Sequence, residues 1–167
     1  LVFIFLVILA GSVVRATGSG MGCPDWPQCF GYTIPPTDVE TLTWRTGRSF
    51  EEGQMILLKD QFWVATADFT TGDAFASENW TLFDRHDYNI FNPVHTWIEF
   101  INRLIGALSG LPVLALAIIG VWGVRRNIWN TILSVGVLFL LLFEARLGKL
   151  VVDGNFVPNQ ITIHMMG

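Results

Sequence analysis

An uncharged run of 21 residues, 104–124, most constrains what this chain can fold into, because it is long enough to span the hydrocarbon core of a bilayer. A second uncharged run of 17 residues covers 127–143, and a third covers 1–14. The chain is 51% hydrophobic and only 14% charged, which is typical of a membrane protein rather than of a soluble domain. We therefore predict an all-α membrane protein.

A cluster of polar side chains stands at the start of the longest run. Five residues follow the spacing i, i+4, i+7, i+8 and i+11, which places them on one face of a helix: His95, Glu99, Asn102, Arg103 and Gly106. Ionisable residues in membrane segments are costly, and they are retained mainly where they line an ion path, a proton relay or a cofactor pocket. The spacing predicts a buried site inside a bundle. An ion pair between Glu99 and Arg103 is the simpler alternative.

The positive charges indicate the orientation. Arg125 and Arg126 separate two of the runs, so this connection is expected in the cytoplasm, and the segment 31–94 is expected outside. The first run has neither an initiator Met nor a basic leader, and 160–167 resembles the start of another helix, so we expect part of a larger protein. The expected order is a truncated first transmembrane helix (1–15), an external segment with the cysteine pair (16–94), a second transmembrane helix (95–124), a cytoplasmic loop (125–127), a third transmembrane helix (128–146), an external loop (147–159) and the truncated start of a fourth transmembrane helix (160–167).

The external segment 31–94 carries ten acidic and four basic residues, a net charge of −6. No basic face is present that could bind nucleic acid, and the many aromatic residues argue against disorder. Residues 55–58 and 62–67 are predicted to form short strands or one hairpin, with Lys59-Asp60 as its turn. We expect a small cap on the mouth of the bundle. The alternative is an external insertion with no catalytic part.

Cys23 and Cys29 are the two cysteines of the chain, and they lie just outside the first run. That compartment is expected to be oxidising, so a disulfide between them is plausible. A zinc site would need further ligands nearby, and the sequence offers none. A structural or regulatory bridge is favoured, and redox activity is the alternative.

Three parts of the chain resemble the heme A synthases, in the order and topology of that family. The exit of their first helix is similar to Gly11-Ser-Val-Val-Arg15-Ala-Thr-Gly-Ser-Gly-Met-Gly-Cys23-Pro-Asp-Trp-Pro-Gln-Cys29-Phe-Gly31. Their second-helix motif is similar to Glu99-Phe-Ile-Asn-Arg103. Their third-helix exit and fourth-helix start are similar to Ala145-Arg-Leu-Gly-Lys-Leu-Val-Val152 and Pro158-Asn-Gln-Ile-Thr-Ile-His164. The segment 32–94 is the part that these motifs do not explain.

The resemblance implies an eight-helix membrane enzyme made of two four-helix bundles, of which this chain would be most of the amino-terminal half with its external cap. The family oxidises a ring methyl group of heme O to a formyl group, which gives heme A for terminal oxidases. Heme B is the family's resident cofactor, expected in the carboxy-terminal half, and heme O is the substrate, expected in this half. The chain alone is therefore expected to be inactive.

The resemblance also implies roles for individual residues. His164 matches the family's axial histidine, and neutral imidazole is a good iron ligand. Glu99 matches the family's acidic residue, and it could relay protons or stabilise positive charge that develops during oxidation. Arg103 and Arg15 are candidates to face heme propionates, since guanidinium pairs with carboxylates. For Arg15 the alternative is a side chain that extends to the membrane interface. Arg146 is a further cofactor-binding candidate.

Asn102 departs from the family pattern, which usually has histidine at this place. Asparagine is a poor iron ligand, so two arrangements remain open. His95 lies on the same face, ~10 Å away along the helix axis, and could be a replacement ligand. Alternatively, His164 is the single axial ligand, which leaves a position on the iron open for oxygen chemistry.

The resemblance implies a multi-pass protein of the bacterial inner membrane whose cysteine loop lies on the outer face. The expected partners are heme O, heme O synthase, membrane lipid and an unidentified electron donor, without nucleic acid, and a homo-oligomer is allowed. One alternative function is a heme-binding electron-transfer protein, which needs paired histidines. Another is a thiol–disulfide membrane oxidoreductase, which usually needs a second cysteine pair.

Overall fold

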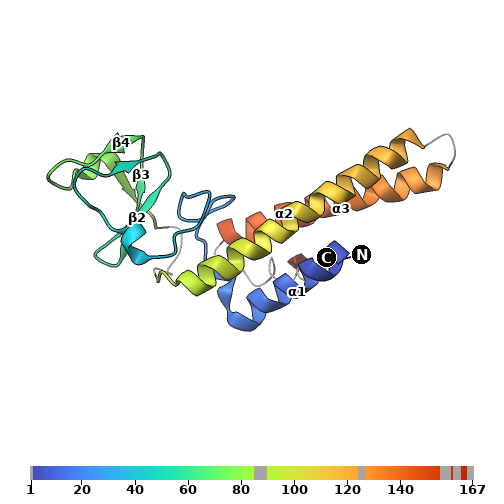
Figure 1. Cartoon of the computed structure of the whole chain (residues 1–167), viewed down its shortest axis with the longest axis horizontal. Coiled ribbons are helices and arrows are strands. Elements are labelled where there is room, and N and C mark those ends of the chain that lie inside the picture. Colours follow the sequence, from blue (N-terminus) through green and yellow to red (C-terminus); the bar gives the residue numbers. More distant parts are fainter. Residues whose placement is uncertain (1, 85–89, 124–126, 155–158, 160–162, 165–167) are drawn as a thin grey trace. The chain divides into compact units, whose positions relative to one another are not determined.

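The computed structural model describes residues 2–84, 90–123, 127–154, 159 and 163–164 (Figure 1). The chain divides into two compact units, and each is described by itself. The helical unit comprises Leu1–Val13 and Ile101–Gly167. The second unit comprises Val14–Phe100 and is called the external unit after the predicted position of its segment 31–94.

The long helices are α1 (Val2–Thr17), α2 (Pro93–Trp122) and α3 (Ile128–Asp153). α2 has 30 residues and is about 45 Å long at 1.5 Å per residue. Among the residues that the structure describes, it is the one helix long and apolar enough to cross a membrane. α1 is also apolar but shorter. The chain is therefore mostly helical, as predicted, while the four-helix bundle stays a prediction.

α2 and α3 pack closely as an antiparallel pair (Figure 1). The Thr131 hydroxyl donates a hydrogen bond of 2.6 Å to the carbonyl oxygen of Gly120. A Cβ atom on Gly120 would lie 2.1 Å from the Oγ and 3.1 Å from the Cβ of Ser134, so a larger residue there would require the Ser134 side chain to move. Asn127 starts α3, because its side chain accepts a hydrogen bond from the Trp129 N–H.

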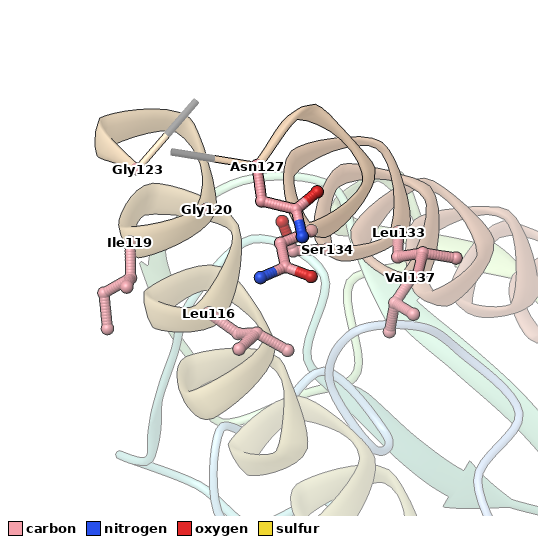
Figure 2. A pocket seen from close by; sticks show the side chains of 9 residues that line it. Leu116, Ile119, Gly120, Gly123, Asn127, Leu133, Ser134 and Val137 are labelled. Carbon is pink, nitrogen blue, oxygen red and sulfur yellow. The ribbon is translucent and has the colours of Figure 1, made fainter. Parts of the chain in front are cut away.

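An open groove lies between the carboxyl end of α2 and the amino end of α3 (Figure 2). Its walls are mostly apolar, with the amides of Asn127 and Asn130 and the hydroxyl of Ser134 as polar groups. No predicted site residue lines it.

The helix ends differ from the expected ranges. α3 continues to Asp153, into the range 147–159 that was expected to be an external loop. Nothing in 147–153 breaks a helix, and Val151 and Val152 are buried, so packing extends the element. The residues 124–126 and most of 160–167 lie outside the described part of the chain, so the predicted cytoplasmic loop and fourth helix stay predictions.

The external unit contains β-structure, so the chain is not all-α. Three strands form an antiparallel sheet in the order β2-β3-β5, namely Met55–Leu58, Gln61–Ala65 and Trp80–Leu82. Two shorter strands, β1 (Ser49–Phe50) and β4 (Phe69–Thr70), form a separate pair. Short 3-10 helices cover Ser19–Met21, Val39–Leu42 and Ser77–Asn79.

The hairpin β2–β3 confirms the prediction for this segment. Lys59 and Asp60 form its two-residue turn, with φ angles of 53° and 59°. Positive φ at both central positions gives the turn a twist that matches the twist of the flanking strands.

Side chains on the two faces of this hairpin enter two different clusters, because neighbouring residues on a strand point to opposite faces. Met55 and Phe62 belong to a cluster with the disulfide and Phe30. Ile56 and Ala65 belong to a second cluster. The second cluster is rich in aromatic rings: Phe50 and Trp80, with Trp44, Trp63, Phe69 and Phe75 at its edge.

Replacing Phe62 tests whether the first cluster stabilises the external unit. The side chain is almost fully buried, and its ring packs against Phe30. Phe62→Ala is expected to lower the free energy of unfolding by about 3–5 kcal/mol, through lost burial and the cavity that remains. Thermal unfolding followed by tryptophan fluorescence would measure this. Leu82→Ala, at a 40% exposed position of the same sheet, is the control; equal losses in both variants would contradict the assignment of Phe62 to the core.

Candidate functional site

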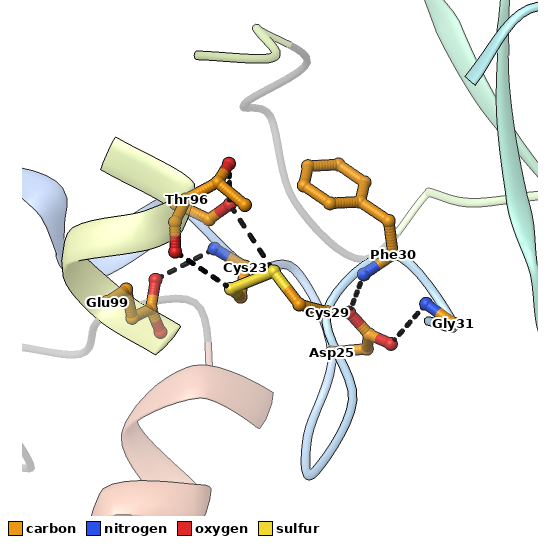
Figure 3. Close-up of a disulfide and its surroundings, with 8 residues drawn as sticks. Cys23, Asp25, Cys29, Phe30, Gly31, Thr96 and Glu99 are labelled. Atoms are coloured by element: carbon orange, nitrogen blue, oxygen red, sulfur yellow. Dashed lines mark hydrogen bonds between the residues drawn. A yellow bond between two sulfur atoms is a disulfide. The ribbon is translucent and has the colours of Figure 1, made fainter. Parts of the chain in front are cut away.

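A disulfide joins Cys23 to Cys29 in the external unit, as the sequence predicted (Figure 3). Both cysteines are buried. The Asp25 carboxylate closes the same loop from inside, since its two oxygens accept hydrogen bonds from the backbone N–H groups of Phe30, at 2.6 Å, and Gly31, at 2.7 Å. The loop is therefore held both covalently and by a carboxylate clamp.

The backbone that leads into this loop lies directly on the first turns of α2. The Thr96 hydroxyl donates a hydrogen bond of 2.8 Å to the carbonyl oxygen of Gly22. A Cβ atom on Gly22 would lie 2.3 Å from the carbonyl oxygen of His95, so this approach requires glycine. The sulfur of Cys23 lies 3.7 Å from the carbonyl oxygen of Thr96; as a disulfide sulfur it carries no proton, so this is a contact and not a hydrogen bond.

Glu99 is the carboxylate at the centre of this arrangement (Figure 3). The residue is 4% exposed, and its Oε2 accepts a hydrogen bond of 2.8 Å from the backbone N–H of Cys23. This bond restrains the orientation of the Glu99 side chain. The residue that sequence analysis assigned to catalysis is thus attached to the disulfide loop.

The β-structure of the external unit is built onto the same loop. The Met55 N–H donates a hydrogen bond of 3.0 Å to the carbonyl oxygen of Phe30. The Phe30 ring packs against Phe62 and Phe91, with ring centroids 5.2 Å and 5.5 Å apart. The external segment therefore supports the loop that contacts Glu99.

Tyr32, which pairs with Cys29 through two backbone hydrogen bonds, continues this support. Burial raises the pKa of its phenol, the Arg48 guanidinium opposes that shift, and Glu51 adds to it. The phenol therefore stays protonated at neutral pH, donating to the carbonyl oxygen of Thr41 and accepting from Arg48.

A second group of candidate site residues, in the helical unit, surrounds His164. Its Nδ1 lies 2.9 Å from Oε2 of Glu144 on α3. Its ring lies over Gly148, where a Cβ atom would be 3.3 Å from Cε1 and 3.4 Å from Nε2. Sequence analysis did not single out Glu144, because its only signal is a carboxylate near the end of an apolar run, 20 residues from its partner.

The other predicted site residues lie on the three long helices. Asn102 faces α1, with its Oδ1 4.0 Å from the place where Gly11 would carry a Cβ atom. His95 is in the first turn of α2, where its N–H donates to the side chain of Asn92. Arg103 is half-buried on α2, while Arg15 on α1 and Arg146 on α3 are exposed. Their roles toward a heme stay predictions. Within the described ranges, no three or more His, Cys, Asp or Glu side chains gather as a metal site.

Comparison with known proteins agrees with the motifs. A family model described as cytochrome oxidase assembly protein (COX15-CtaA) matches residues 1–68. The heme A synthase of Shewanella oneidensis is 28% identical over 169 aligned residues, which cover the whole chain and 38% of that protein. The heme A synthase of Bartonella quintana is 27% identical over 157 residues, 93% of this chain and 36% of that protein.

The resemblance to the heme A synthases is confirmed. The chain spans less than two fifths of the length of these relatives. No solved structure matches it significantly. The match to the family model ends at residue 68, beyond β3, so it includes residues 32–68 of the segment that the motifs did not explain.

Replacing Gly22 tests the contact between the loop and α2. In Gly22→Ala the new methyl group would overlap the backbone of α2, so the loop must move away and Glu99 must lose its bond to Cys23. We expect a lower melting temperature and faster reduction of the disulfide, measured by thiol alkylation and mass spectrometry after mild reductant. Gly72→Ala is the control, because a Cβ atom there meets nothing within 4 Å. Identical reduction rates in the two variants would disprove the close contact.

Proposed function

We propose that this protein acts as a heme A synthase, which oxidises a ring methyl group of heme O to a formyl group and so provides heme A for terminal oxidases. The observation that carries the proposal is similarity to two heme A synthases along nearly the whole chain. The buried Glu99 supports it, because it stands in the family's second-helix motif and is held in one orientation. The expected partners are heme O, a heme O synthase that supplies it, and an electron donor.

Glu99 is the proposed catalytic residue. A buried carboxylate can accept or pass on a proton, and it can stabilise positive charge that develops on a substrate. The N–H of Cys23 engages Oε2 and thereby orients the carboxylate. The disulfide loop and the external segment behind it serve this orientation, so they are part of the working site in this proposal.

His164 is the proposed axial ligand to the iron of the substrate heme. The donor set fits, because a neutral imidazole whose Nδ1 is engaged by a carboxylate presents Nε2 to a metal. When bound, the heme supplies the redox chemistry of its iron. Arg15, Arg103 and Arg146 are proposed to pair with the propionates. Asn102 is a poor ligand and faces α1, which favours His164 alone or His164 with His95.

The proposed topology is multi-pass in the bacterial inner membrane, with a four-helix bundle in this half and the external unit on the outer face. The disulfide supports the proposed position of the external unit on the outer face, since disulfides persist in oxidising compartments. A resident heme B is proposed for the part of the enzyme that this chain does not cover, and association into a homo-oligomer is compatible with the proposal.

The proposal is tested by expressing the intact protein with a heme O synthase in a host that makes no heme A. Extracted hemes are separated by chromatography with mass detection. We expect heme A or its hydroxylated precursor. Glu99→Gln should lower its rate of formation by about 10²–10⁴-fold, the usual contribution of a general acid or base.

Glu78→Gln, which changes an exposed carboxylate of the same unit, is the matched control and should keep the wild-type rate. Unchanged turnover in Glu99→Gln would remove Glu99 from catalysis. Wild-type protein that binds heme but leaves heme O untouched would instead support electron transfer.

A further inference from the structure

The side chains of Glu144 on α3 and of His164 are in contact. The distance from Nδ1 to Oε2 is 2.9 Å, and the side chains are 40% exposed for His164 and 25% exposed for Glu144. A carboxylate accepts hydrogen bonds and cannot donate them when ionised. An ionised carboxylate at this place therefore favours a proton on Nδ1, which leaves Nε2 as the nitrogen that a metal would use.

The His164 ring also lies close to Gly148. It follows Glu144 by one helical turn, so both residues are on the same face of α3. A Cβ atom at 148 would be 3.3–3.4 Å from Cε1 and Nε2, tighter than an ordinary contact. Gly148 thus leaves space for the imidazole ring, and Glu144, one turn earlier, provides a hydrogen-bond acceptor for it.

We propose that Glu144 is a positioning residue for His164: it fixes the tautomer and the ring orientation and increases the basicity of Nε2 as a ligand to the substrate heme. The proposal rests on the axial role of His164 given under the proposed function. Carboxylate partners of this kind are common behind metal-bound histidines, and their loss typically weakens metal binding about 10–100-fold.

A purely structural ion pair is the competing explanation. It would stabilise the contact between the two segments but would not change the electronic properties of the iron. A carboxylate behind the ligand does change them, because its negative charge favours the oxidised, more positive iron. The reduction potential of the heme therefore separates the two explanations.

The experiment titrates heme O into the detergent-solubilised intact protein and measures the affinity and the midpoint potential of the bound heme. The variants are His164→Ala, Glu144→Ala and Glu144→Gln. The control is Asp153→Asn, which changes another carboxylate of α3 whose ion-pair partner is Lys149, 4.0 Å away.

We expect heme affinity to fall about 10–100-fold in Glu144→Ala. In Glu144→Gln, which keeps a hydrogen-bond acceptor of the same size, we expect partial recovery of affinity with a raised midpoint potential. Asp153→Asn should match the wild type in both quantities.

Two results would overturn the proposal, and they differ. If His164→Ala leaves affinity and spectrum unchanged, the axial role in the proposed function fails, and the positioning role fails with it. If His164→Ala weakens binding while both Glu144 variants match Asp153→Asn, His164 remains the ligand and Glu144 is a structural partner only.

Discussion

The external unit depends on the hydrogen bond between the buried carboxylate of Glu99 and the backbone N–H of Cys23. Burying a carboxyl group that is 4% exposed is costly unless it is hydrogen-bonded, and a buried polar group left without a partner costs about 1–3 kcal/mol. That bond requires the loop to approach α2 closely, which the absence of a side chain at Gly22 permits. The Thr96 hydroxyl, bound to the Gly22 carbonyl, fixes the register of the approach.

The disulfide by itself holds this loop only modestly. Closing a loop of about seven residues stabilises a fold by ~2 kcal/mol in the chain-entropy description. The clamp by Asp25 and the packing of Phe30 against Phe62 add restraints that do not depend on the sulfur atoms. The β-structured segment therefore supports the loop that contacts α2, in addition to the disulfide.

The features that the sequence predicted are local ones. The hairpin at 55–65 follows from residue types within a dozen positions, and the disulfide follows from two cysteines six residues apart. The pair β1–β4 was missed because each strand has two residues and its partner lies about 20 positions away, so no periodic pattern exists to detect. The end of α3 was misplaced because packing of Val151 and Val152 extends the helix beyond its apolar run.

The two carboxylate contacts could not be predicted from spacing either, since Glu99 and Cys23 are 76 residues apart and Glu144 and His164 are 20 apart. They nevertheless share a physical logic. In each, a carboxylate next to an apolar run contacts an N–H group, which is a backbone amide for Glu99 and an imidazole nitrogen for Glu144. A backbone amide orients the Glu99 carboxyl group and transmits no charge to a further group. An imidazole N–H that is bound to a carboxylate is different, because the negative charge increases the electron density of the whole ring, including Nε2. In the proposed roles, Glu99 takes part in proton chemistry, whereas Glu144 positions the ligand His164.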